Sequence, residues 1–288
     1  MRIYWFYFIF LLSFHLGAQA TELHVMSFNI RYPNPNDGEN YWPNRKDKVA
    51  SMITYHEADI IGLQEAFRSQ MDDLKALLPD YFTFFGVCRT DGSVHPKPDN
   101  EFSSILYRKD KLEFMEGNTF WLSEQPEKIG EAGWDAALPR IATWAKFKDR
   151  SNGKVFFHFN THFDHQGEKA RANSAKLILD RIESIAGDHP VILTGDFNCI
   201  PEDEPYQILI DEKRKGHLYD AYFMTYTPPH GPNGTWTNSF EVPGVEGRRI
   251  DYIFIKNQVK VLKHGILSDS WGGLLPSDHL PVLTKIRF

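Results

Sequence analysis

The sequence predicts a mixed α/β fold in which β-sheets pack together and helices cover their outer faces. Three observations support this prediction. Short apolar runs of strand length alternate with segments of helical periodicity, and two pairs of strand-like segments flank short loops of turn residues. With 288 residues and 42% hydrophobic content, the chain can also bury a large core.

Helices are predicted where apolar residues recur at a spacing of three or four. The residues that set these faces are Val49, Met52 and Ile53, then Met71, Leu74, Leu77 and Leu78, then Ala175, Ile178, Leu179, Ile182 and Ile185. The third pattern is the clearest, and Gly187 after it is typical of a residue that ends a helix.

Strands are predicted for the apolar or alternating runs between these helices. They cover residues 60–63, 81–87, 191–195 and 280–286. Residues 143–148 and 155–161 flank an Asp-Arg-Ser-Asn-Gly segment, which predicts a hairpin. Residues 250–255 and 259–267 flank a three-residue loop and predict a second hairpin.

The candidate site residues described below extend from residue 29 to residue 279, so both halves of the chain must meet at one site. The sequence contains no Pro/Ser-rich spacer, low-complexity tract or repeat. We therefore expect a single domain over residues 21–288, and we expect it to be a monomer.

The first 20 residues are a different kind of segment. Arg2 precedes an apolar run from Trp5 to Phe14, and Ala18-Gln19-Ala20 follows as a small-residue cleavage site. This order is typical of a secretory signal peptide, and ten apolar residues are too few to span a bilayer, which takes about 20. We expect an exported protein without membrane insertion after processing. A periplasm is the preferred compartment, with full secretion or a eukaryotic lumen as alternatives.

Charge and cysteine content narrow the function further. The net charge of −6 becomes −7 when residues 1–20 are removed, because Arg2 is the one charged residue among them. Tight nonspecific binding to duplex DNA usually needs a basic surface, so any contact with nucleic acid must be local. Cys88 and Cys199 are the only thiols. We expect both to be buried small hydrophobes, with a disulfide as the alternative.

Polar residues stand at the ends of several predicted strands. Asp196 and Asn198 directly follow an apolar run at residues 191–193. A carboxylate can take a proton from water and an amide can hold a phosphoryl oxygen, although an Asx turn or a helix N-cap would use the same residues. Other strand ends carry Asn29, Glu65, Asn160 and His162, whereas Asp251 lies inside an alternating strand and Asp278 and His279 open the last strand.

Together, these motifs in this order resemble the endonuclease/exonuclease/phosphatase superfamily, which includes pancreatic deoxyribonuclease, deadenylases and inositol-phosphate phosphatases. The resemblance covers approximately residues 22–288. It implies two β-sheets packed as a sandwich with helices on both outer faces. It also implies hydrolysis of a phosphoester by in-line attack of water, assisted by a divalent metal ion.

The metal ion is expected to be Mg²⁺ or Mn²⁺, because hard cations take one or two carboxylates and leave other positions to water and phosphate. Glu65 is the first candidate ligand, with Asn29 supporting it and Asp278 beside it. The resemblance makes Asp196 the general base or water-orienting group and Asn198 the amide that positions an oxygen.

Two histidine pairs are expected at the same site. The resemblance implies that Asp251, on a strand expected to neighbour that of His279, would orient and charge this histidine. The segment around Glu101 resembles that of deoxyribonuclease, which implies that Glu101 partners His162 and that His162 contacts the substrate phosphate or the leaving group. Phosphate contacts are assigned to Arg140, Arg249 and Asn160. By contrast, Asp164 and His165 are expected to have a loop or helix-capping role rather than to bind metal, and Trp121 is expected to pack in the core.

The substrate is the least determined property. The segment at residues 247–252 resembles the nuclease and deadenylase branch, and the Trp-Cys-Asp-Arg pattern of inositol-polyphosphate 5-phosphatases is absent. The leading interpretation is a phosphodiesterase acting on single-stranded nucleic acid or nucleotides. The alternatives are a phosphomonoesterase for a sugar or inositol phosphate, and a catalytically silent binding protein with the same fold, against which the intact acidic residues argue.

Overall fold

The computed structural model describes residues 20–241 and 247–288. The predicted signal peptide therefore lies, except for its last residue, outside the described residues. Within the described part of the chain, no helix combines the length and apolar character needed to cross a membrane.

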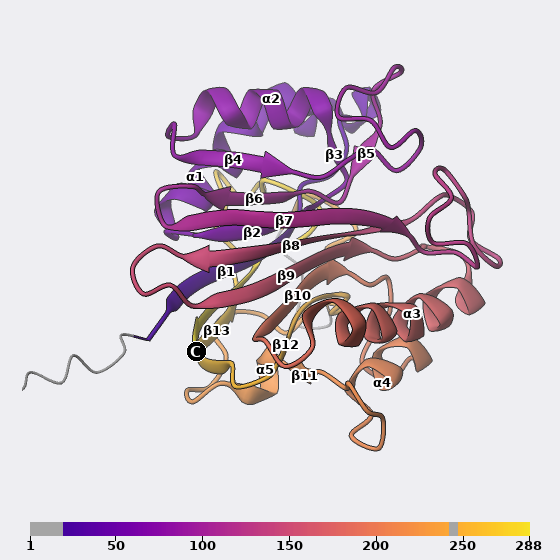
Figure 1. Ribbon diagram of the computed structural model, residues 1–288. Coiled ribbons are helices and arrows are strands. Elements are labelled where there is room, and N and C mark those ends of the chain that lie inside the picture. Colours follow the sequence, from indigo (N-terminus) through magenta and orange to yellow (C-terminus); the bar gives the residue numbers. More distant parts are fainter. Residues whose placement is uncertain (1–19, 242–246) are drawn as a thin grey trace, which may run out of the picture.

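Two mixed six-stranded sheets form the body of the described chain (Figure 1). The first contains, in spatial order, β13 (Lys260–Ile266), β14 (Val282–Arg287), β1 (Glu22–Asn29), β2 (Ile60–Gln64), β6 (Ile105–Arg108) and β4 (Phe82–Phe85). The second contains β11 (Tyr219–Asp220), β12 (Asp251–Lys256), β10 (Val191–Asp196), β9 (Val155–His162), β8 (Ile141–Asp149) and β7 (Leu112–Trp121). A small additional sheet pairs β3 (Ala66–Phe67) with β5 (Glu101–Phe102).

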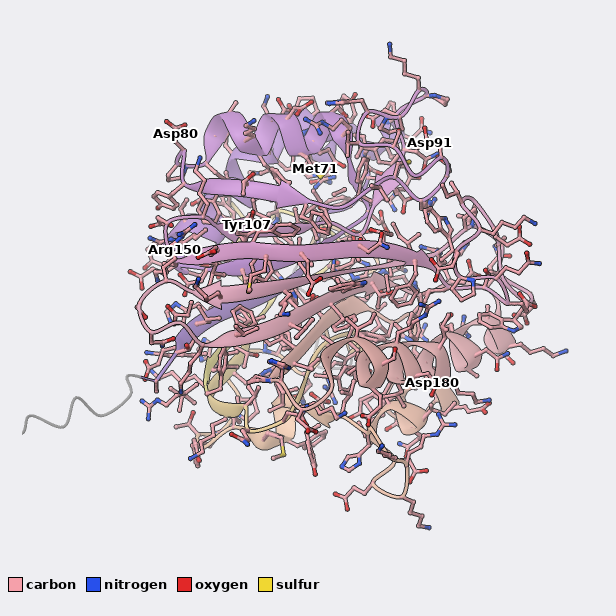
Figure 2. All side chains as sticks on the ribbon, viewed as in Figure 1. Met71, Asp80, Asp91, Tyr107, Arg150 and Asp180 are labelled. Atoms are coloured by element: carbon pink, nitrogen blue, oxygen red, sulfur yellow. The ribbon has the colours of Figure 1, made fainter. Side chains whose placement is uncertain are left out.

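The helices cover the outer faces of these sheets. Two lie against the first sheet, α1 (Lys46–Tyr55) and α2 (Arg68–Leu77), whereas α3 (Glu168–Ala186) and α4 (Glu204–Ile210) lie against the second. Shorter helices are η1 (Pro35–Asn40), η2 (Trp42–Asn44) and α5 (Ala221–Met224). Figure 2 labels Met71, a buried residue of α2, and Asp80 and Asp180, which lie at the surface. The predicted sandwich with helices on both outer faces is confirmed.

Strand alternation explains how the layers form. On β1, Met26 and Phe28 pack under the helices, whereas Val25 packs between the sheets. On β10, Leu193 packs under α3 while Ile192 faces the other sheet. Because successive side chains point to opposite faces, Asn29, Asp196 and Asp251 follow the inward series of their strands and emerge at one end of the interface between the sheets.

One predicted hairpin is confirmed and the other is wrong. The β8 and β9 strands pair antiparallel, with Phe147 opposite Phe156. In contrast, β12 pairs with β10 and β11, whereas β13 pairs with β14 in the other sheet. The connection passes through Asn257 and Gln258, both at positive φ. Crossing between sheets lets both strands bury apolar side chains in the central core, so alternation alone could not distinguish the two connections.

Smaller predictions also have outcomes. The three helical patterns correspond to α1, α2 and α3, and Gly187 follows α3 at positive φ. Cys88 and Cys199 are buried and free, so the alternative of a disulfide is wrong. Trp121 is buried and its indole N–H donates to the Arg89 carbonyl at 2.7 Å, which confirms a packing role.

Candidate active site

A cleft of about 630 Å³ opens where the inward strand ends meet. Its lining combines most of the predicted site residues with several that the sequence did not indicate. The predicted residues are Glu65, Glu101, Arg140, His162, Asp196, Asn198, Asp278 and His279. The others include Arg31, Tyr32, Leu138, His165, Arg171, Asp203, Trp236 and Arg248.

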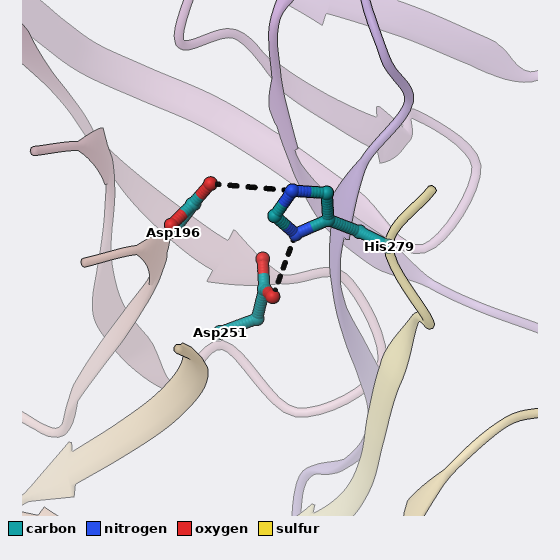
Figure 3. A group of neighbouring side chains, drawn as sticks. All are labelled: Asp196, Asp251 and His279. Carbon is teal, nitrogen blue, oxygen red and sulfur yellow. Dashed lines mark hydrogen bonds and ion pairs between the residues drawn. The ribbon is translucent and has the colours of Figure 1, made fainter. Parts of the chain in front are cut away.

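His279 lies between two carboxylates at the floor of this cleft (Figure 3). Its Nδ1 is 2.9 Å from Asp251 Oδ2, and its Nε2 is 3.8 Å from Asp196 Oδ2. Burial opposes the charged ring, but Asp251 and Asp196 outweigh it and raise the pKa of His279 well above its usual value. The imidazole is therefore held as an imidazolium.

The two acids reach this histidine from the opposite sheet. Asp196 on β10 and Asp251 on β12 are direct register partners, whereas His279 precedes β14 of the first sheet. The expectation that Asp251 and His279 lie on neighbouring strands is thus wrong, although their side chains do meet. Ligand atoms of these three residues lie within 4.8 Å of one another. The protons on the charged His279 ring bridge the two carboxylates, so these three residues do not need a metal ion between them. A protonated imidazolium has no free lone pair and cannot ligate a metal ion.

Asp196 has the environment of a group that exchanges a proton near neutral pH. Burial and the neighbouring Asp251 raise the pKa of Asp196 to about 7. Its Oδ2 accepts from Asn29 Nδ2 at 3.0 Å, and its Oδ1 accepts from the Asn198 backbone N–H at 3.0 Å. These two hydrogen bonds fix the direction of the carboxylate toward the cleft.

Asn198 directly follows this strand in a left-handed conformation, with φ of 48°. Its amide nitrogen donates to the Phe163 carbonyl at 3.0 Å and lies 3.1 Å from His162 Nε2. Both amide protons are engaged in this structure. Asn198 must release one of these contacts before it can donate to a phosphoryl oxygen.

His162 lies near both guanidiniums and carboxylates, with its Nε2 3.4 Å from Asp196 Oδ2. Burial, together with Arg140 and Arg89, lowers its pKa well below the usual value, so the ring is neutral. The expected pair with Glu101 is not formed as a hydrogen bond, because His162 Nδ1 is 4.0 Å from Glu101 Oε2, and within residues 20–241 and 247–288 this nitrogen has no hydrogen-bond partner. Glu101 instead accepts from Arg89 at 2.8 Å. A guanidinium at this position competes for the carboxylate.

Glu65 and Asp278 form the acidic side of the cleft. Burial opposes ionisation of Glu65, but His279, the Tyr32 N–H and Arg31 together lower its pKa. For Asp278, burial and the charge of Glu65 raise the pKa despite His279. The charge of Glu65 makes ionisation of Asp278 more costly, and a divalent cation held by both carboxylates would relieve that repulsion.

Asn29 supports these carboxylates rather than presenting an oxygen ligand, which corrects its assignment to the metal. Its amide nitrogen lies 3.2 Å from Glu65 Oε1 and 3.0 Å from Asp196 Oδ2, whereas its oxygen accepts the Arg31 backbone N–H at 3.0 Å. The side chain thus joins the acidic side of the cleft to the proposed base.

Two predicted phosphate contacts are wrong. Arg249 is buried against Asp220 at 2.6 Å, and its guanidinium lies 4.7 Å from the ring centres of both Tyr222 and Tyr252. Its neighbour Arg248 lines the cleft instead. The side chains of these adjacent arginines point in different directions, and local sequence does not distinguish the two positions.

Asn160 has a structural role between the sheets. It is fully buried, and its amide donates to the carbonyls of Leu63 and Ser104 at 2.8 and 2.9 Å. Its oxygen accepts from Gln64 Nε2 at 2.7 Å. All its polar capacity is used inside the protein, so it cannot bind substrate phosphate.

Arg140 lines the cleft with one nitrogen to spare. Its Nε is 3.3 Å from Asp164 Oδ2 and its Nη2 is 3.0 Å from His165 Nδ1, whereas Nη1 is buried without a partner in the described structure. Backbone amides, including that of Gly167, lower the pKa of Asp164 to about 2 against the effect of burial. Asp164 therefore has the expected loop role, but His165 lies on the cleft wall.

Arg45 holds the loops that carry the site. Its fully buried guanidinium donates to the carbonyls of Ile30, Arg31 and Pro276, and to that of Asn40. These carbonyls flank Asn29 on one side and Asp278 on the other. No local pattern indicates this role, because the bonded carbonyls come from three separate segments.

Comparison with known proteins gives the family. The model of the Endonuclease/Exonuclease/phosphatase family matches residues 26–279, and the chain belongs to that family. The known members are hydrolases of phosphoesters, including nucleases and phosphatases, which agrees with the cleft described above.

Two solved structures are similar over almost the whole chain. An endonuclease/exonuclease/phosphatase from Bacteroides vulgatus is 41% identical, with a TM-score of 0.86 over 92% of this chain and 98% of that one. A mannosyl-6-phosphatase from Bacteroides thetaiotaomicron is 37% identical, with a TM-score of 0.86 over 92% of this chain and all of that one.

Other relatives are similar at lower identity. The CCR4-Not complex 3'-5'-exoribonuclease subunit Ccr4 from Mycosarcoma maydis is 22% identical over 94% of this chain and 51% of its own length. Nocturnin from Drosophila melanogaster is 27% identical over 85% of this chain, and the match spans only 40% of nocturnin. The human nocturnin catalytic domain, at 19% identity and a TM-score of 0.70, shares the fold.

Proposed function

We propose that this protein is a phosphomonoesterase that hydrolyses a small phosphorylated sugar. The observation that carries the proposal is the cleft of about 630 Å³, a size suited to one small substrate. Its walls mix carboxylates, guanidiniums and a tryptophan, instead of presenting the uniformly basic groove that a nucleic acid backbone favours. The similarity to the mannosyl-6-phosphatase supports the same choice. This reverses the order of the two substrate classes inferred from sequence.

In this reaction, Asp196 takes the proton of the attacking water. Its raised pKa makes it a base matched to neutral pH, and its hydrogen bonds from Asn29 and Asn198 fix its direction. His279, charged by Asp251, stabilises the phosphoryl oxygens as negative charge builds on them. No covalent intermediate is required.

Arg140, which lines the same cleft, receives the phosphate. Its Nη1 has no hydrogen-bond partner among the described residues, and neutral His162 keeps Asn198 in place through Nε2 until substrate arrives. Because His162 is neutral, it carries no surplus proton that it could give to a leaving group. We therefore assign it a positioning role rather than that of an acid.

Glu65 and Asp278 would hold Mg²⁺ or Mn²⁺. When bound, the ion would supply neutralisation of charge on the substrate phosphate.

A substrate panel tests the proposal. Mature protein is assayed with Mg²⁺, with Mn²⁺ and with EDTA against hexose 6-phosphates, p-nitrophenyl phosphate, bis-p-nitrophenyl phosphate and single-stranded RNA. We expect metal-dependent release of phosphate from the monoesters, fastest from a hexose phosphate. The Asp251→Asn variant serves as a control for contaminating phosphatases.

The alternative is the phosphodiesterase inferred from sequence, which the similarity to the exoribonuclease subunit Ccr4 favours. Faster cleavage of RNA or of the diester than of every monoester would replace our proposal with that one. Absence of hydrolysis with every substrate would favour a silent binding protein.

A further inference from the structure

The cleft contains two opposite charges that do not pair with each other. Arg171 on α3 and Asp203 just before α4 both line it, together with Asp196 and Asn198. Within residues 20–241 and 247–288, neither Arg171 nor Asp203 forms an ion pair. A donor and an acceptor are thus exposed to the same space, and each retains unused hydrogen-bonding capacity.

Asp203 occupies the N-cap position of α4 without capping the helix. An aspartate at this position commonly accepts from the first backbone amides of the helix. Here, one oxygen, Oδ2, accepts the Ile200 backbone N–H at 3.0 Å instead. That contact fixes the carboxylate, and Oδ1 has no hydrogen bond among the described residues.

Arg171 is fixed in a comparable way. Its Nη1 donates to the Asp164 carbonyl at 3.0 Å, which anchors the guanidinium to the loop between β9 and α3. Nε and Nη2 make no hydrogen bond within the described chain. A half-buried guanidinium anchored at one nitrogen presents its remaining donors in a fixed direction.

Hydroxyl groups are the chemistry that satisfies such a pair. Each sugar hydroxyl can donate one hydrogen bond and accept others, so adjacent hydroxyls can donate to Asp203 and accept from Arg171. A second phosphate would be repelled by Asp203, and an apolar leaving group would leave both charges without partners. We propose that Arg171 and Asp203 form the subsite for the polyhydroxylated leaving group and determine specificity for it.

This inference rests on the proposed function and adds the residues that select the substrate. Asp203 follows Asn198 on the same loop, so one segment carries both the phosphate end of the site and the leaving-group end. The residue proposed to select the substrate and the residue that positions the phosphate are therefore held by the same short loop.

The test is the ratio of kcat/KM for a hexose 6-phosphate to kcat/KM for phenyl phosphate, which has no hydroxyls. The variants are Asp203→Ala and Arg171→Met, and the matched control is Glu202→Ala, an exposed neighbour outside the cleft. We expect the ratio to fall about 10-fold to 10²-fold in each variant, as when one buried hydrogen-bonding partner is removed, and to stay unchanged in the control.

A second measurement separates recognition from folding. For the wild type, hexose phosphates lacking single hydroxyls should lose a similar factor, and the Asp203→Ala variant should not distinguish the deoxy sugar from the parent. Equal losses on hexose phosphate and phenyl phosphate, or a wild type with no preference between them, would overturn the subsite while leaving the phosphomonoesterase intact. A wild type that hydrolyses no monoester with either metal would overturn both proposals.

Discussion

The two histidines at the floor of the cleft are both buried, yet their surroundings give them opposite charges. His279 lies against Asp251 and Asp196, which raise its pKa, whereas Arg140 and Arg89 add to the effect of burial on His162 and lower its pKa. Burial alone would make both rings neutral. The identity of the neighbouring groups therefore decides which histidine is a cation.

The carboxylates expected to pair with the two histidines also differ in the hydrogen bonds that they form. Asp251 forms a hydrogen bond with His279 at 2.9 Å. Glu101 accepts a hydrogen bond from Arg89 instead and lies 4.0 Å from His162. The first pair forms a hydrogen bond, whereas His162 Nδ1 makes none with any residue that the structure describes. His279 is therefore suited to stabilise negative charge, whereas His162 is suited to orient its neighbours.

Removal of the metal ion should have the largest effect, because it leaves the acidic side of the cleft with no cation to offset Glu65 and Asp278. We expect EDTA to lower kcat/KM by about 10³-fold or more, since a metal ion contributes several kcal/mol to charge stabilisation. Readdition of Mg²⁺ or Mn²⁺ should restore the rate. Full activity in excess chelator would contradict the metal assignment.

Loss of the charged pair should come next. We expect His279→Ala and Asp196→Ala each to lower kcat/KM by about 10² to 10⁴. Asp251→Asn should cost nearly as much as His279→Ala, and the double variant little more, because the pair acts as a unit. Circular dichroism checks the fold. A folded, fully active Asp196→Ala protein would refute its role as base.

The other pair should not behave as a unit. Glu101→Gln retains an acceptor for Arg89 and removes no hydrogen bond from His162, so we expect a loss of about tenfold or less, smaller than that of Asp251→Asn. His162→Ala should cost more than Glu101→Gln because Asn198 loses a partner. Equal losses for the two variants would show that Glu101 and His162 pair during the reaction.

The pH dependence of stability should differ in sign between the two histidines. The raised pKa of His279 contributes stability that is full below about pH 6.5 and is lost as pH rises through the folded-state pKa. The lowered pKa of His162 costs stability as pH falls below about 6.5.

Urea denaturation of His279→Gln and His162→Gln at several pH values measures this difference. Relative to wild type, the first variant should be weakest at low pH, and the second should become comparatively more stable there. Parallel pH curves would show that the two rings carry the same charge.

The smallest effect is expected for His165. It lies on the cleft wall and contacts Arg140, but no carboxylate or metal candidate depends on it for position. We expect His165→Ala to change kcat/KM by only a few-fold on p-nitrophenyl phosphate. A loss as large as that of His279→Ala would place His165 in the reaction itself.

Much of the fold and part of the site could be predicted from local patterns. Periodicity located α1, α2 and α3, and strand ends located Glu65, Asp196, Asn198 and His279. Both signals depend on residues close in sequence, where spacing alone determines which face a side chain takes.

The sequence by itself determined which chemical groups the protein can bring to a phosphoester, because carboxylates, amides and histidines at the ends of buried strands emerge where those strands end. Tertiary structure decided the rest. Whether β12 and β13 pair, whether Arg248 or Arg249 faces the cleft, and whether Glu101 serves His162 or Arg89 depend on segments far apart in the chain. Charge states are set over a few ångströms by burial and by neighbouring charges, and those distances exist only once the two sheets have packed.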